Sequence, residues 1–152
     1  MSSRLIQRLV ATDARLAPLV LRIPVGIIFI AHGAQKLFGW FGGYGLQGTA
    51  KWMASFGLSP AELLAPLAGS AEFFGGLALL VGLLVRPAAA ALAFTMLTAI
   101  FGVHIAHGLF LSNNGYEYAL ALLACSASLV VSGAGLLSLD GALARNALVG
   151  GR

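Results

Sequence analysis

Residues 20–41, VLRIPVGIIFIAHGAQKLFGWF, form a long apolar stretch that nevertheless contains an arginine, a histidine and a lysine. The whole chain has 152 residues, of which 59% are hydrophobic and 9% are charged, and its mean hydropathy is +0.93. A soluble domain usually carries about 25% charged residues, so this chain has too few polar side chains to cover a surface that faces water. The composition therefore predicts a single integral membrane domain.

Four stretches are long and apolar enough to cross a bilayer core of about 30 Å as helices. The predicted spans cover residues 16–38, 62–84, 88–110 and 116–137. We therefore expect an all-α fold, an antiparallel four-transmembrane-helix bundle with one long extracytoplasmic loop after the first helix. SPAE at 59–62 predicts a capping box at the start of the second span. RP at 86–87 predicts a tight turn between the second and third spans.

The basic residues indicate how the bundle is oriented. Those on the side of the termini are Arg4, Arg8, Arg15, Arg86, Arg145 and Arg152, whereas the other side holds Lys36 and Lys51. Because cytoplasmic loops are enriched in Lys and Arg, both termini are expected in the cytoplasm of a bacterial cell, with the bundle in the plasma (inner) membrane. Residues 1–15 are then a cytoplasmic N-terminal segment, and 138–152 a cytoplasmic tail able to form a small amphipathic helix. The first span is too long for a cleavable signal peptide and contains Arg22.

Two further features limit the function classes. The net charge is +4, but the basic residues are scattered and form no patch for nucleic acid. The single cysteine, Cys125, excludes an intrachain disulfide and lies in an apolar context.

The loop 39–57 is rich in glycine and aromatic residues, which suit the membrane interface. Its segment 49–56, TAKWMASF, is predicted to form a short helix that either anchors the loop there or covers a pocket.

Ionisable residues recur inside the predicted spans, where a charge costs at least about 2.5 kcal/mol and is usually paired inside the bundle. Glu72 should lie near the midplane, since a helix rises about 1.5 Å per residue. We expect a core ion pair between Arg22 and Glu72, with Lys36 or a histidine as the alternative partner of Glu72. The same estimate predicts a polar pocket in the outer half of the bundle, lined by His32, Lys36, Glu72, His104, His107 and Glu117.

Each of these residues also has a plainer interpretation. Arg22 and Lys36 could extend to the headgroups at opposite membrane faces, and His104 and His107 could be interfacial. Glu117 could be a first-turn acid that the helix dipole favours. Glu72 is too short and too deep for such an explanation, which favours a shared internal site.

The residue types of the pocket allow several ligands. His104 and His107, at i and i+3, could bind a metal together with His32 or Glu117. Haem would need histidines deeper in a roomier bundle. A quinone headgroup fits better, because the pocket combines apolar walls with groups that donate or accept protons. No residue is itself a redox centre, so electron transfer would require a cofactor or a partner protein.

The chain resembles the DoxX family of small bacterial membrane proteins over residues 21–141. The matching segments are LRIPVGIIFIAHGAQKLFG (21–39), LLAPLAGSAEFFGGLALLVGLLVRPAA (63–89), HIAHGLFLSNNGYEYALALL (104–123) and GAGLLSLDGAL (133–143). The family pattern has glycine-proline-glycine where this chain has GAG. The resemblance implies a four-helix membrane bundle, and the family residues that carry over are Arg22, His32, Gly33, Lys36, Glu72, Gly76, His107 and Glu117.

The family is named for a subunit of a quinol-oxidising terminal oxidase and of a thiosulfate:quinone oxidoreductase, and some members are described as redox-homeostasis partners. The resemblance thus implies a quinone-linked accessory subunit of a membrane oxidoreductase or redox-homeostasis complex. The alternatives are a non-catalytic scaffold that holds a soluble redox enzyme at the membrane, and a small transporter or proton relay. The partners expected are the lipid bilayer, an oxidoreductase subunit and, from the glycine-rich helix faces, a second copy of the chain; nucleic acid is not expected.

Overall fold

The computed structural model describes residues 16–150, and their side chains as far as residue 146. This part of the chain consists of helices joined by turns and loops and contains no strand, which confirms the predicted all-α class. The long helices are α2 (Ala17–Phe38), α4 (Ala61–Val81), α5 (Val85–Ala99) and α6 (Glu117–Ser132), and the shorter ones are α3 (Gly45–Ser55) and α7 (Leu139–Gly150). Beyond α5 the chain continues as a π-helical turn, η2 (Ile100–His104), and a 3₁₀ turn, η3 (Ile105–His107). Two more 3₁₀ turns, η1 (Trp40–Gly42) and η4 (Leu111–Asn113), lie in the connections.

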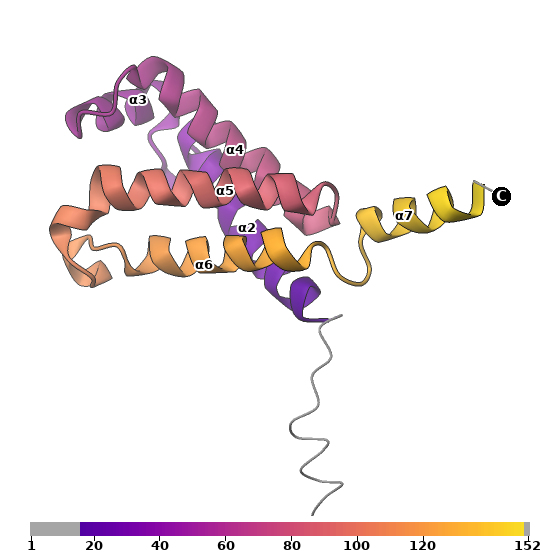
Figure 1. The fold of residues 1–152 in the computed structure, drawn as a ribbon. Coiled ribbons are helices and arrows are strands. Elements are labelled where there is room, and N and C mark those ends of the chain that lie inside the picture. The colour runs from indigo at the N-terminus through magenta and orange to yellow at the C-terminus, as the bar shows by residue number, and fades with distance from the viewer. Residues whose placement is uncertain (1–15, 151–152) are drawn as a thin grey trace, which may run out of the picture.

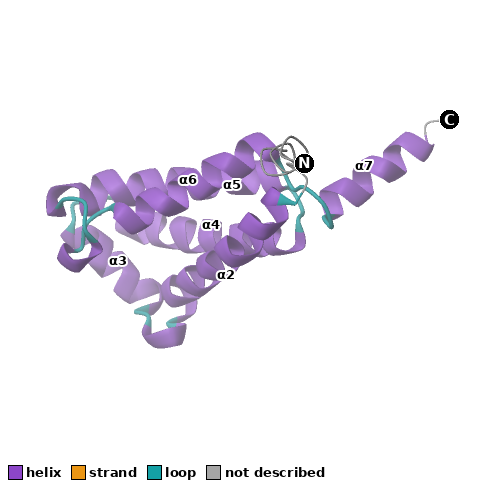
Figure 2. Cartoon of the chain, turned by 90° about the horizontal axis from the view of Figure 1, so that it is seen from below, coloured by secondary structure: helices purple, strands orange, loops and turns teal. Residues whose placement is uncertain are grey.

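The four long helices pack into one bundle, with α2 paired against α4 and α5 paired against α6. In Figure 1, α3 and the turns between α5 and α6 lie at one end of the bundle, while α7 projects from the opposite end. Figure 2, from below, shows the same division. The core between the helices contains Phe29, Leu79, Leu92 and Leu129, each with no exposed surface.

The outer surface of the bundle is apolar. Val20, Ile27, Phe94, Phe101 and Val131 are each more than half exposed and come from α2, α5, η2 and α6. Three helical segments, 17–38, 61–81 and 85–107, are long and apolar enough to cross a membrane, and α6 is a shorter apolar helix. A soluble protein rarely exposes so large an apolar surface. The structure is thus that of a multi-pass membrane protein.

Glycines set the close crossing of α2 and α4. A Cβ added at Gly26 would lie 2.8 Å from the Gly76 carbonyl oxygen, and one at Gly33 would lie 2.7 Å from the Phe73 Cα. Small residues allow helix backbones to approach this closely. The contact fixes the register of the two antiparallel helices, and this register decides which ionisable groups meet.

The predicted ion pair between Arg22 and Glu72 is wrong. The Arg22 side chain is 1% exposed and donates to backbone carbonyls instead. Nη1 donates to Leu79 O at 2.8 Å and to Leu80 O at 2.7 Å, both at the end of α4. In the observed register, Arg22 lies level with this helix end, about two turns below Glu72. The last carbonyls of a helix lack intrahelical partners, and the guanidinium supplies donors for them.

The rest of the guanidinium group holds the segment that follows α6. Nε donates to Ala134 O at 3.1 Å, and Nη2 donates to Leu137 O at 2.6 Å. Helix α6 ends at Ser132, earlier than the predicted limit at 137, because Gly133 takes a positive φ of 75°. Non-helical backbone at membrane depth is tolerated only where its polar groups are satisfied by protein. Arg22 satisfies these carbonyls, and the contact places the start of α2 beside the link to α7.

The start of α5 also differs from the expected turn. Arg86 and Pro87 lie in the first turn of α5, and the reversal is made by Gly82–Leu84. A proline is tolerated there because the first backbone N–H groups of a helix have no intrahelical acceptor. The carboxylate of Asp140, in α7, caps this end by accepting from Leu84 N at 2.7 Å and Val85 N at 3.0 Å. The capping box predicted at 59–62 is not formed, since Pro60 is the N-cap of α4 and no side chain caps it.

Candidate functional site

Glu72 pairs with Lys36, the alternative partner that the sequence suggests. Lys36 Nζ donates to Glu72 Oε2 at 2.5 Å. The Glu72 side chain is 3% exposed and the Lys36 side chain is 23% exposed. Burial of a carboxylate is costly unless it is paired, and this contact supplies its partner. The pair joins the last turns of α2 to the middle of α4.

The neighbouring elements hold Lys36 in this position. A Cβ at Gly69 would lie 3.3 Å from the Cβ of Lys36, so α4 passes directly beside the lysine stem. The buried hydroxyl of Thr49, in α3, donates to the Lys36 carbonyl oxygen at 3.3 Å. The loop helix α3 is therefore fastened to the end of α2, and both sides of the lysine are constrained.

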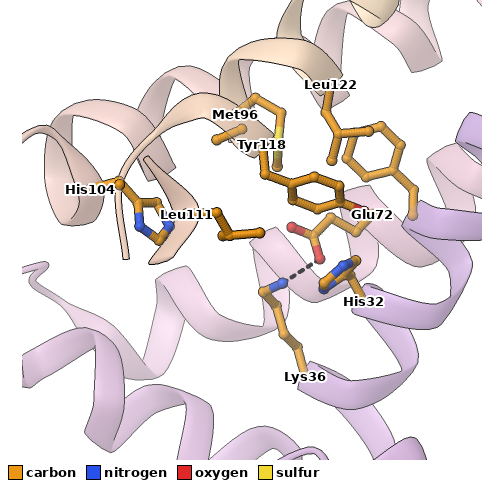
Figure 3. A pocket seen from close by; sticks show the side chains of 11 residues that line it. His32, Lys36, Glu72, Met96, His104, Leu111, Tyr118 and Leu122 are labelled. Carbon is orange, nitrogen blue, oxygen red and sulfur yellow. Dashed lines mark hydrogen bonds and ion pairs between the residues drawn. The ribbon is translucent and has the colours of Figure 1, made fainter. Parts of the chain in front are cut away.

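The ion pair lines a cavity of about 130 Å³ inside the bundle. The walls come from α2, α4, α5, η2, α6 and the turn that precedes α6. The lining residues are Phe29, His32, Lys36, Glu72, Met96, His104, Leu111, Gly115, Tyr118, Ala119 and Leu122. Figure 3 shows Glu72, His32 and Tyr118 gathered near the Lys36 ammonium group, with His104 farther away. The ring centroids of His32 and Tyr118 are 6.0 Å apart.

The predicted pocket is only partly assembled. His32, Lys36, Glu72 and His104 line the cavity, whereas His107 and Glu117 do not. His107 is exposed at the end of η3. Glu117 Oε1 accepts from Leu111 N at 2.6 Å, which fastens the turn before α6. Glu117 therefore acts on the cavity through the backbone of Leu111, because its carboxylate is already used in that hydrogen bond.

The histidines of η2 and η3 form no metal centre in the described part of the chain. Residues 16–146 contain no group of three or more His, Cys, Asp or Glu side chains that could hold a metal ion. His104 Nδ1 donates to Asn114 O at 2.8 Å, and this hydrogen bond fixes the ring against the turn before α6. His104 and His107 thus lack the third ligand that a metal site would require.

Comparison with known proteins agrees with this architecture. The model of the DoxX family matches residues 17–105. This chain belongs to the DoxX family. A Bacillus subtilis (strain 168) protein named "Putative oxidoreductase CatD" is 32% identical over 122 residues, which cover 80% of this chain and 83% of that protein. The Escherichia coli (strain K12) inner membrane protein YqjF is 37% identical over 128 residues, which cover 80% of this chain and 88% of that protein. No solved structure matches the chain.

The DoxX match covers the helices that carry the ion pair. It includes α2, α4 and α5, and with them His32, Lys36, Glu72 and His104. The wall formed by α6 lies beyond the matched residues, although it closes the same cavity. The matched residues therefore contain both members of the ion pair, and the α6 wall of the cavity lies outside them.

Tyr118 is a polar residue of the cavity that the sequence did not predict. Its ring faces His32 across the cavity, and Leu122, one turn later in α6, lines the same wall. The spacing of these two residues, i and i+4, puts them on one face of a helix. This spacing is visible in YALALL (118–123) and is the sequence signal for this wall of the cavity. Met96 and Leu111 were missed for a simpler reason: apolar residues of a membrane helix give no signal of their own.

Proposed function

We propose that this DoxX protein is a quinone-linked accessory subunit of a membrane oxidoreductase or redox-homeostasis complex in the bacterial inner membrane. The observation that carries the proposal is the cavity, in which a buried ion pair, an imidazole and a phenol face apolar walls. A cavity of about 150 Å³ accepts a single benzene ring, so a volume of about 130 Å³ suits one ring rather than a large ligand.

Each polar group has a role toward such a ring. The ammonium group of Lys36 and the hydroxyl of Tyr118 can donate hydrogen bonds to quinone carbonyl oxygens. Glu72 and His32 can accept or return the protons of a hydroquinone hydroxyl. Phe29 and Met96 supply the apolar walls. The electrons must pass to or from the redox centre of a partner oxidoreductase, because the side chains of this cavity provide none.

The relatives support the same class of function without specifying it. One is named as an oxidoreductase and the other as an inner membrane protein. An accessory subunit would bring the quinone ring to a catalytic partner, which fits a small helical bundle with no soluble domain among residues 16–150. Expression with its partner would then be needed for turnover, whereas quinone binding would belong to this chain.

Quinone retention tests the proposal. The protein would be purified into lipid nanodiscs, equilibrated with a quinone and washed, and the quinone extracted and quantified. We expect the parent to retain quinone and Glu72→Gln to retain at least about tenfold less, because a neutral amide holds the Lys36 ammonium group, a donor to the quinone carbonyl, less firmly than the carboxylate does. The fold should persist in this variant, since Lys36 is partly exposed and can reach water.

Glu62→Gln is the matched control, because Glu62 lies on the same helix in its exposed first turn. Equal retention by the parent, Glu72→Gln and Glu62→Gln would contradict the proposal. A parent that retains no quinone but still co-purifies with a soluble redox enzyme would instead favour the scaffold. Proton flux through proteoliposomes without quinone would favour the relay.

A further inference from the structure

A second, larger depression lies on the other side of the ion pair. Its volume is about 310 Å³, and it runs between α3, α4 and α5 and the η2 turn. Its walls are almost entirely apolar and include Met53, Leu64, Ala71, Ala91, Phe94 and Val103. Lys36 and Glu72 are the charged residues on its wall. We call this depression the lateral groove.

The lateral groove shares a wall with the smaller cavity of about 130 Å³ described above. Lys36 and Glu72 line both spaces, although only 3% of the Glu72 side chain is exposed. The ion pair therefore separates a small polar chamber from a longer apolar one. Trp52 also lines both the lateral groove and an outer depression beside Lys36. An occupant that suits both spaces would carry a polar ring at one end and a hydrocarbon chain at the other.

We propose that the lateral groove holds the hydrocarbon tail of the same molecule whose ring occupies the cavity. This inference rests on the proposed function, because it assigns the second half of a tailed quinone. The molecule enters from the lipid between α4 and α5, and the partly exposed Lys36 side chain moves away from Glu72 to admit the ring toward Tyr118. The two charged side chains then mark the junction of ring and tail.

Because the groove opens to lipid, its effect on ligand binding differs from that of an apolar groove in water. Lipid chains are as apolar as the groove walls, so moving a tail from lipid into the groove yields little transfer free energy. The groove acts instead by giving the tail a place while the ring is bound. Blocking the groove should therefore exclude tailed quinones by steric conflict and leave a tail-less ring unaffected.

A groove-filling variant tests this assignment. Ala91 lies in the groove and is exposed, so Ala91→Phe fills the space without disturbing the core. Ala90→Phe is the matched control, because Ala90 is the adjacent exposed alanine of α5 and lies outside the groove. Binding would be measured in nanodiscs for an otherwise unsubstituted benzoquinone ring without a tail and with a decyl tail. Quenching of Trp52 emission in a Trp40→Phe background provides the readout.

We expect Ala91→Phe to weaken binding of the decyl compound about tenfold and to leave binding of the tail-less ring unchanged, with Ala90→Phe like the parent for both. If both compounds bind the parent and Ala91→Phe equally, the tail assignment is wrong while the proposed function stands. If neither compound binds the parent, the proposed function fails and the tail assignment falls with it. A phospholipid retained by the parent, lost in Ala91→Phe and not displaced by the decyl compound would assign the groove to bilayer lipid and overturn the proposal.

Discussion

At the scale of single residues, the charged side chains inside the bundle bind what the helix register brings beside them: Lys36 binds Glu72, and Arg22 binds backbone carbonyls. Arg22, Lys36 and Glu72 were all recognisable because a charge in an apolar helix needs an explanation. Their pairing depends on the register of α2 against α4, and helix depth estimated from chain position carries an error of a turn or more. A carboxylate was also a more obvious partner for Arg22 than a set of backbone carbonyls, which no sequence pattern displays.

Replacement of Arg22 tests its structural role. Arg22→Met should lower the thermal unfolding temperature in detergent strongly, because each carbonyl left without a donor costs about 1–3 kcal/mol. Arg22→Lys should recover only part of the loss, since an ammonium group offers fewer donors and no planar fork. Arg145→Met, at an exposed position of α7, serves as the control and should unfold like the parent. An Arg22→Met protein as stable as the parent would rule out the carbonyl network as a stabilising feature.

At the scale of elements, local sequence signals predict the membrane-spanning helices, but they do not predict the helix ends that long-range contacts determine. The apolar spans and the small residues of α2 and α4 were informative because lipid and close helix packing demand them. The sequence near the helix ends did not predict where the helices stop. Asp140 caps α5 from a distant part of the chain, and the segment after α6 leaves the helix to reach Arg22. Such ends are determined by tertiary contacts, so a local capping pattern misplaced them.

The crossing of α2 and α4 gives a prediction at this scale. Gly33→Ala should disrupt the bundle, because its Cβ would meet the Phe73 backbone, which cannot move aside. Gly75→Ala is the comparison, since its Cβ would meet only the Leu92 side chain at 3.1–3.3 Å, which can shift. Overpacking of this kind costs about 1–3 kcal/mol. Thermal melting of both variants would check the ranking, and an equal effect would indicate that the crossing tolerates extra bulk.

At the scale of the whole molecule, composition predicted the fold well and the site only in part. An apolar chain with four long hydrophobic stretches has few folds available to it, because every backbone polar group in lipid must be satisfied internally. The cavity needs more information, since its walls come from residues far apart in the sequence. Phe29 and Tyr118 meet there only after four helices have packed.

The distribution of basic residues predicts the orientation of the whole bundle in the membrane. In a Cys125→Ser background, Ser55→Cys would report the loop after α2, and Asn146→Cys would report α7; both positions are exposed and uncharged. A membrane-impermeant maleimide should label Ser55→Cys in spheroplasts and Asn146→Cys only after lysis. The opposite pattern would reverse the assignment of the two faces, and labelling of both before lysis would indicate that the bundle does not cross the membrane as proposed.

The fastening of Arg22 has a consequence for biosynthesis. The arginine leaves the ribosome early, yet one of its acceptors, Ala134 O, is synthesised 112 residues later. Until then the guanidinium has only the carbonyls at the end of α4, Leu79 O and Leu80 O, as protein acceptors. The hydrogen bonds of Arg22 are therefore complete only when the segment after α6 has been made, and synthesis of that segment fastens the first helix of the bundle to the last part of the chain.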